Sequence, residues 1–247
     1  MIIFVCNNDV NGLLSALFVS FTEKILPCEV IDRNVYQPRF DCLIREIRTD
    51  IQSSDRVKKA LFNYAGDDVI AHLKLCLSSC DKRALTVAFN YAYRILSERK
   101  DISENLSDRY VSDFSFIVQK VLHERHIVSG FLRFQESSSG VLYAQYTPDN
   151  DITSILAPHF LRRLGNIPFI IHDKKRNKIA ISNGKAIKIT QTTLPANFSL
   201  AENEKNVTEL WKRYFKSINI EQRKNPKLQN GYFPRRYRHH AFETWET

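Results

Sequence analysis

Two histidines and an aspartate in the second half of the chain have the residue types of an acid–base site. His159 falls in a segment with helical spacing, and His172 and Asp173 stand at the end of a predicted strand. A histidine beside a carboxylate is a common general acid/base arrangement. Adjacent strand residues point to opposite faces, however, so His172 and Asp173 need not touch. The simpler structural interpretation is that His159 is a core histidine and that Asp173 begins a turn toward Arg176.

Arginines near these candidates offer a second kind of chemistry. Arg133, Arg162 and Arg163 carry planar guanidinium groups, which can hold a phosphate through two hydrogen bonds at once. Together with the histidines they would suit an enzyme that acts on nucleic acid, either a hydrolase or a base-processing enzyme. The sequence contains no GxSxG, Walker or GxGxxG motif that would identify a reaction.

Positive charge is concentrated near the C-terminus. Between Lys205 and His240 there are ten Lys and Arg against two Glu, a balance of +8 in a chain of net charge +9. Aromatic residues interleave these cations, a pattern typical of surfaces that bind phosphates and stack on exposed bases. The predicted nucleic-acid contacts are Arg133, Arg162, Arg163, Lys212, Arg213, Lys216, Arg223, Lys224, Lys227, Arg235, Arg236, Arg238 and Tyr237, with Tyr232 as the alternative stacking residue. The competing interpretation is a solvated tail whose arginine–carboxylate pairs contribute little.

The overall charge indicates the class of partner, and the hydropathy of the chain indicates the compartment. A pI of about 9.3 favours DNA, with RNA as the alternative. A membrane surface fits less well, because Asn225-Pro226 and Phe233-Pro234 interrupt the basic segment. No apolar run approaches the ~18–20 residues of a membrane span, and the N-terminus lacks signal-peptide features. We therefore expect a cytoplasmic protein.

Neither the cysteines nor the remaining histidines predict a metal or a cofactor. The five cysteines form no CxxC pair and are typical of reduced, buried thiols. His123 and His126 flank Glu124 on a predicted helix, but surface histidines at a helix C-terminus have a simpler explanation in the helix dipole. The CxxxCxxC motif that would hold an iron–sulfur cluster is also absent.

Hydrophobic periodicity predicts the elements that position these residues. In the first half it is largely helical, with candidate strands at 2–6, 30–31 and 43–47 and helices at 10–24, three times between 54 and 100, and at 107–128. After Gly130 the period becomes two, giving strands at 131–135, 141–146, 169–172, 178–182 and 186–189 around a helix at 151–164. The predicted fold is α+β: a mainly helical region with a short leading strand, 1–128, and a region, 129–247, with an antiparallel sheet, packed helices, a C-terminal helix from Ser199 and a basic tail.

Several short motifs together resemble a bacterial family of probable DNA-metabolism and DNA-repair proteins. The opening, Phe4 to Phe18, is similar, and the later motifs are Gly130 to Phe134, Leu156 to Phe160 with Arg162-Arg163, Ile171 to Asp173 with Arg176, Leu210 to Lys212 with Tyr214-Phe215, Glu221 to Leu228 and Phe233 to Tyr237. The C-terminal half resembles the family's domain of unknown function, which also occurs fused to uracil-DNA glycosylase. The resemblance implies a radical SAM protein as partner in DNA repair or modification, and it implies no catalytic residue.

Three functions from different classes follow from these observations. The first is a DNA-binding accessory protein in bacterial DNA repair or modification, acting with a radical SAM partner. The second is a nucleic-acid-processing enzyme that uses His159, His172 and Asp173. The third is a protein-interaction module whose basic surface meets an acidic partner.

Overall fold

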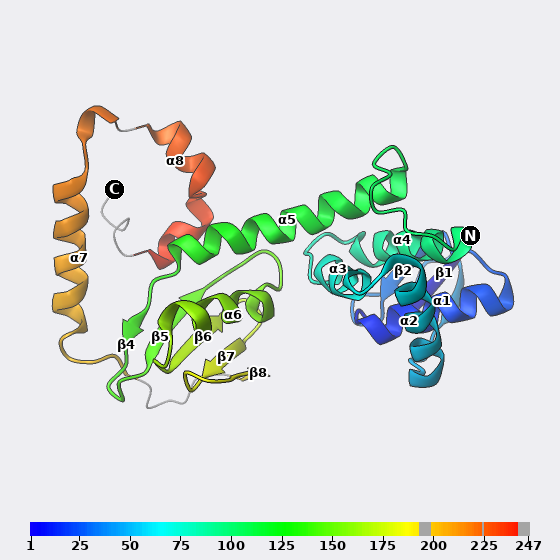
Figure 1. Ribbon diagram of the computed structural model, residues 1–247, viewed down its shortest axis with the longest axis horizontal. Coiled ribbons are helices and arrows are strands. Elements are labelled where there is room, and N and C mark those ends of the chain that lie inside the picture. The colour runs from blue at the N-terminus through cyan, green and yellow to red at the C-terminus, as the bar shows by residue number, and fades with distance from the viewer. Residues whose placement is uncertain (193–198, 224, 242–247) are drawn as a thin grey trace. The chain divides into compact units, whose positions relative to one another are not determined.

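The chain forms two compact units, residues 1–122 and 123–247, in a computed structural model that describes residues 1–192, 199–223 and 225–241 (Figure 1). Helix α5 (Arg109–Phe131) continues across the boundary between the units. The predicted α+β class is confirmed, with a helical first half and a sheet with helices in the second.

The first unit is built on a small parallel sheet. Its strands are β1 (Ile2–Cys6), β2 (Glu29–Asp32) and β3 (Leu43–Glu46), and the order β2-β1-β3 places β1 in the centre. The last four residues of β1 are buried, as suits an apolar strand covered on both faces. The three strands match the predicted positions. Their parallel pairing was not predicted, because periodicity shows where strands lie but not which strands pair.

Helices supply most of the core of this unit. They are α1 (Val10–Glu23), α2 (Ile51–Ala65), α3 (Asp68–Leu77), α4 (Ala84–Glu98) and the first part of α5. Asp9 caps α1, since its carboxylate accepts a hydrogen bond from the Gly12 N–H at 2.8 Å. Phe4 and Phe89 are fully buried and meet edge to face, 6.2 Å between ring centres. The helix predicted at 10–24 and the three between 54 and 100 are confirmed.

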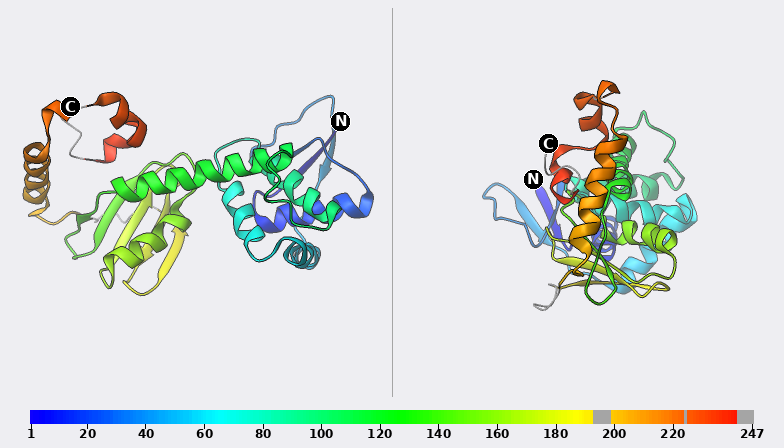
Figure 2. Two further views of the ribbon diagram at one scale, coloured as in Figure 1. Left: turned by 45° about the horizontal axis from the view of Figure 1, so that its top comes forward. Right: turned by 90° about the vertical axis from the view of Figure 1, so that its left-hand side faces the viewer.

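The second unit contains a five-stranded sheet whose strands follow the chain order. They are β4 (Gln135–Glu136), β5 (Leu142–Tyr146), β6 (Phe169–Asp173), β7 (Lys178–Ser182) and β8 (Ile187–Gln191). Three neighbouring pairs are antiparallel as expected, whereas β5 and β6 are parallel. The reason is α6 (Thr153–Leu164), which connects these two strands as a crossover helix. It lies along one face of the sheet (Figure 2).

The C-terminal helix begins later than predicted. It is α7 (Glu204–Ile218), followed by η1 (Glu221–Arg223), α8 (Pro226–Tyr232) and η2 (Arg235–His240). Ser199 does not cap it, because the Ser199 carbonyl accepts from the Ser138 N–H at 3.0 Å beside a bridge between Ser137 and Leu200. Over the described residues, no helix has both the length and the apolar content needed to cross a bilayer.

Candidate nucleic-acid interface

The net positive charge belongs entirely to the second unit. Residues 1–122 contain 16 Lys and Arg and 16 Asp and Glu, whereas residues 123–247 contain 20 and 11, which accounts for the whole +9. An excess of cations attracts a phosphate backbone regardless of its sequence. The candidate interface is therefore a property of the second unit.

Helix α7 carries exposed cations beside exposed apolar side chains. Arg213 and Lys216 are exposed, whereas Lys212 is mostly covered and pairs with Glu209 at 3.0 Å. An apolar stripe runs along the helix but is not buried; its exposed members are Val207, Leu210, Trp211, Tyr214 and Ile218.

Arg133 joins this surface from the end of α5. Its guanidinium lies 5.5 Å from the ring centre of Trp211, within the range of a cation–π contact. The structure thus brings one predicted arginine of the sheet region to α7.

The short helices after α7 present further cations. Arg223, Lys227 and Arg235 are exposed, and their side chains make no ion pair with any described residue. Lys224 lies outside the described residues. Tyr232 is 70 % exposed and is the aromatic ring in this segment available to stack on a base.

Tyr237, in contrast, is not accessible for stacking, contrary to the prediction. Its side chain is buried, and its hydroxyl donates a hydrogen bond to the carboxylate of Glu124. Burial, and secondly this hydrogen bond, raise the pKa of Tyr237. Arg236 lies over the Tyr237 ring and pairs with Asp149 at 3.0 Å. Arg238 is hydrogen-bonded to Asn230 at 2.8 Å.

Glu124 is the structural residue that sequence reasoning missed. Its buried carboxylate accepts the backbone N–H groups of Asp149 (2.7 Å) and Asn150 (2.8 Å), the Asn150 side-chain amide (2.6 Å) and the Tyr237 hydroxyl. It thereby fastens η2 and the loop after β5 to helix α5. The flanking histidines gave no signal of this role. No group of three or more potential metal ligands gathers among the described residues.

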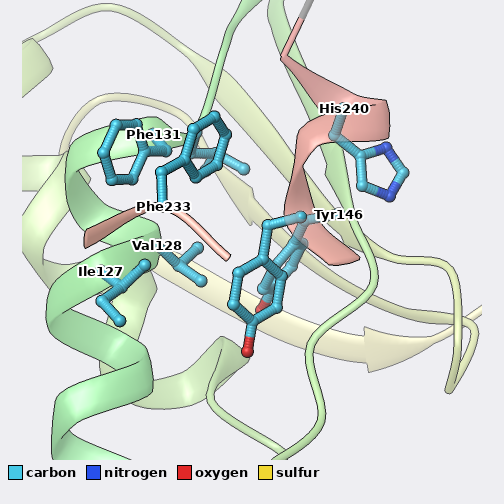
Figure 3. Close-up of a pocket in the computed structure, with 8 residues that line it drawn as sticks. Ile127, Val128, Phe131, Tyr146, Phe233 and His240 are labelled. Atoms are coloured by element: carbon cyan, nitrogen blue, oxygen red, sulfur yellow. The ribbon is translucent and has the colours of Figure 1, made fainter. Parts of the chain in front are cut away.

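A small apolar cavity lies beside this hub, between α5, β5 and η2 (Figure 3). Phe131 stacks on Phe233, with 3.9 Å between ring centres, and His240 is hydrogen-bonded to Thr147 at 3.1 Å. The lining residues are Ile127, Val128, Phe131, Leu132, Tyr146, Phe233, Tyr237 and His240. This apolar packing holds the C-terminal segment against α5.

His159 stands among arginines on α6. Burial, followed by the positive charges of Arg163, Arg162 and Arg125, lowers the pKa of His159 and favours its neutral form. Its Nε2 atom is buried and has no hydrogen-bond partner within the described parts of the chain. Arg162 and Arg163 are exposed on the last turn of the helix. The structure thus gathers the two predicted arginines with a third, Arg125 of α5.

His172 and Asp173 lie on opposite faces of the sheet. The His172 Nδ1 atom is hydrogen-bonded to the Tyr143 hydroxyl at 3.0 Å. Asp173 is fully buried; it accepts the Lys175 and Arg176 N–H groups and pairs with the Arg176 side chain at 3.0 Å. The turn expected at Asp173 is therefore present.

The sheet separates the two histidines. Helix α6 packs on the face that carries Asp173, because Thr153 at its start is hydrogen-bonded to Tyr146, the register partner of Asp173, at 2.9 Å. His172 points to the other face, as strand alternation requires. This arrangement does not form one acid–base site from His159, His172 and Asp173.

Comparison with known proteins places most of the chain in one family. The model of a domain of unknown function, DUF4130, matches residues 82–243, about two thirds of the chain. The match runs from the loop before α4 through η2 and so contains every described residue of the candidate interface. No curated protein matches the chain.

Proposed function

We propose that this chain, which belongs to the DUF4130 family, is a DNA-binding accessory protein whose second unit holds the phosphate backbone. The observation that carries the proposal is the location of the charge: one unit is electrically neutral and the other has +9. Exposed cations without ion pairs among the described residues, such as Arg213, Arg223 and Arg235, are available to phosphates.

The biological setting that we propose rests on the family resemblance. The motifs are similar to those of bacterial proteins of DNA repair or modification that accompany a radical SAM protein. In that setting the radical SAM partner performs the chemistry, and this chain presents the DNA. The separation of His159 from His172 by the sheet supports an accessory role over the alternative of a nucleic-acid-processing enzyme.

A protein-interaction surface is the second candidate, and the apolar stripe of α7 favours it. Leu210 and Tyr214 are more than half exposed, although removing such side chains from water is favourable. The cations on the same helix, Arg213 and Lys216, would suit an acidic partner protein.

Salt dependence of binding tests the DNA-binding proposal. Fluorescence anisotropy would measure the affinity of the full chain for labelled duplex DNA, single-stranded DNA and RNA of equal length, between 50 and 200 mM salt. With about four phosphate contacts, affinity for duplex falls about 100-fold over this range. Recovery of the oligonucleotide in chemically unaltered form after incubation with the protein agrees with an accessory role. Affinity for DNA that does not change with salt contradicts the proposal. Tighter binding of RNA than of DNA would identify RNA as the ligand.

A further inference from the structure

A second candidate site lies in the first unit, at the carboxyl end of β2. A cavity of about 580 Å³ opens there, between the loop after β2 and the start of α4. Its size is within the range of small-molecule sites, about 300–1,000 Å³. The lining residues are Asn8, Glu29, Ile31, Asp32, Val35, Gln37, Pro38, Arg39, Ser79, Cys80, Asp81, Lys82, Ala84 and Leu85.

The topology at this cavity is that of a nucleotide-binding β-α-β unit. Ligands of open parallel sheets bind outside the carboxyl ends of the strands, and an acidic residue about 20 positions after the glycine-rich turn binds the ribose hydroxyls. Here β1, α1 and β2 follow one another, β1 and β2 are parallel, and Asp32 ends β2. Asp32 follows Gly12 by 20 residues.

The turn after β1 has the spacing of the G-x-G-x-x-G motif, but only the last of its three glycine positions is occupied by glycine. Asn7, Asp9 and Gly12 occupy the positions of G-x-G-x-x-G. A Cβ atom on Gly12 would lie 2.4 Å from the carbonyl oxygen of Asn7, so only glycine fits this contact between turn and helix. The close packing that the third glycine permits is thus preserved.

The place of a phosphate, in contrast, is already filled. Asp9 caps α1 with its carboxylate, 2.8 Å from the Gly12 N–H. It puts a negative charge at the helix N-terminus, where a pyrophosphate would otherwise bind. The cavity lining adds Glu29, Asp32 and Asp81 against Arg39 and Lys82, so its formal charge is also negative. Such a site disfavours phosphate groups.

Asp32 is held in place with one oxygen unused by the protein. Its Oδ1 atom accepts from the backbone and side-chain N–H groups of Asn34, at 3.2 and 3.3 Å. Its Oδ2 atom accepts from no residue that the structure describes. A carboxylate oxygen in a cavity suits a donor such as a ribose hydroxyl. Val35 and Pro38 also line the cavity and offer apolar surface to a base.

We propose that this cavity binds an uncharged ribonucleoside. The ribose hydroxyls donate to Asp32, and the base lies against Val35 and Pro38. The site is in the neutral unit and is independent of the DNA contacts proposed for the second unit.

The first test compares ligands. Isothermal titration of the full chain would use adenosine, guanosine, cytidine and uridine, their 2′-deoxy forms and their 5′-monophosphates. At least one ribonucleoside should bind saturably. Its 2′-deoxy form should bind about 10- to 100-fold more weakly, the loss expected for one hydrogen bond to a carboxylate, and its monophosphate should bind no more tightly. The proposal is overturned if no ribonucleoside binds up to millimolar concentration, or if the deoxy form or the monophosphate binds at least as tightly.

The second test changes the protein. Asp32→Asn keeps an oxygen for Asn34 but replaces the unused acceptor with an amide, so nucleoside binding should weaken by the same factor. Asp55→Asn on the exposed surface of α2 makes the same change of charge and should have no effect. Thermal melting checks that both variants fold. Binding by Asp32→Asn as tight as by the unchanged chain overturns the proposal. DNA affinity should be the same in both variants, so the two proposals can fail separately.

Discussion

The two units of this protein differ in how they use charge. In the first unit, cations and carboxylates balance, and several are paired with each other, as in the ion pair of Arg39 with Glu29. In the second unit, cations exceed carboxylates by nine, and Arg213, Arg223 and Lys227 pair with no described residue. The cavity that we propose as a nucleoside site lies in the neutral unit, and the cations that we propose as DNA contacts lie in the positively charged unit. The high pI of the whole chain therefore comes from the second unit alone and does not indicate that the first unit is neutral.

The units also differ in what holds them together. The first has an extended apolar core that draws on its sheet and on α1 to α5. In the second, the C-terminal segment is held by a small cluster around Phe233 and by the buried carboxylate of Glu124. Changes in the two units should therefore act on stability through different interactions.

The largest expected effect is the loss of a core side chain from the first unit. Phe89→Ala removes a fully buried ring and should lower the free energy of unfolding by about 3–5 kcal/mol. Trp211 and Trp245 both belong to the second unit, so tryptophan fluorescence reports that unit, while far-UV circular dichroism reports helices of both. The dichroism transition should shift and the fluorescence transition should stay. A common shift of both would show that the units unfold together.

The matched change in the second unit should have little effect. Leu210→Ala on α7 alters a side chain that is 62 % exposed and should change the unfolding free energy by less than about 0.5 kcal/mol. A larger loss would show that the α7 stripe is covered in solution.

Charge reversal should have the next largest effect, and on DNA affinity alone. Changing four exposed cations of the second unit to Glu should weaken DNA binding by about 100-fold or more and reduce the salt slope by ~3.6; they are Arg213, Arg223, Lys227 and Arg235. The control reverses four exposed cations of the neutral unit, Arg48, Lys58, Lys59 and Lys74. Equal losses from both variants would mean that DNA responds to total charge and not to one unit.

The carboxylate hub of the second unit should give an intermediate effect on stability. In Glu124→Gln, an amide N–H group replaces one oxygen and faces hydrogen-bond donors from Asp149, Asn150 or Tyr237. The loss should be about 1–3 kcal/mol, seen in the fluorescence transition of the second unit. Tyr237→Phe removes one of these hydrogen bonds and should cost less. An unchanged transition in Glu124→Gln would exclude the hub as a stabilising contact.

The smallest effect concerns pH. Burial, followed by the charge of Lys174 and opposed by Asp173, lowers the pKa of His172, so the folded state favours the neutral ring. Above the unfolded pKa of about 6.5 the His172 ring is neutral in both states. Below that pH, protonation favours the unfolded state, so the free energy of unfolding decreases as pH falls. Between pH 7 and 5 the second unit should lose stability, and His172→Gln should lose less. His72→Gln, on the exposed side of α3, should behave as the unchanged chain does.

Local sequence patterns predicted elements well where a single helix or strand sufficed. Asp9 and the apolar spacing after it are enough to place α1, and the last four strands of the second sheet lie close to their predicted bounds. The strand predicted at 131–135 was wrong, because α5 continues to Phe131 and β4 is only Gln135–Glu136. The start of α7 was missed, because Ser199 bonds across to Ser138 and not along its own helix. The parallel pairing of β5 with β6 arises because α6 returns the chain to the same end of the sheet, and hydrophobic periodicity does not show which strands pair.

The sequence by itself determined the amount of charge, its concentration near the C-terminus and most of the elements, because these depend on composition and on neighbours within a few residues. Only the tertiary structure decided which candidate side chains are accessible and which face each other. Tyr237 is covered because it meets Glu124, 113 residues away in the chain, and His172 is separated from His159 by a sheet whose strands come from several segments. Burial and contact are set by residues distant in sequence, so they appear only when the chain is folded.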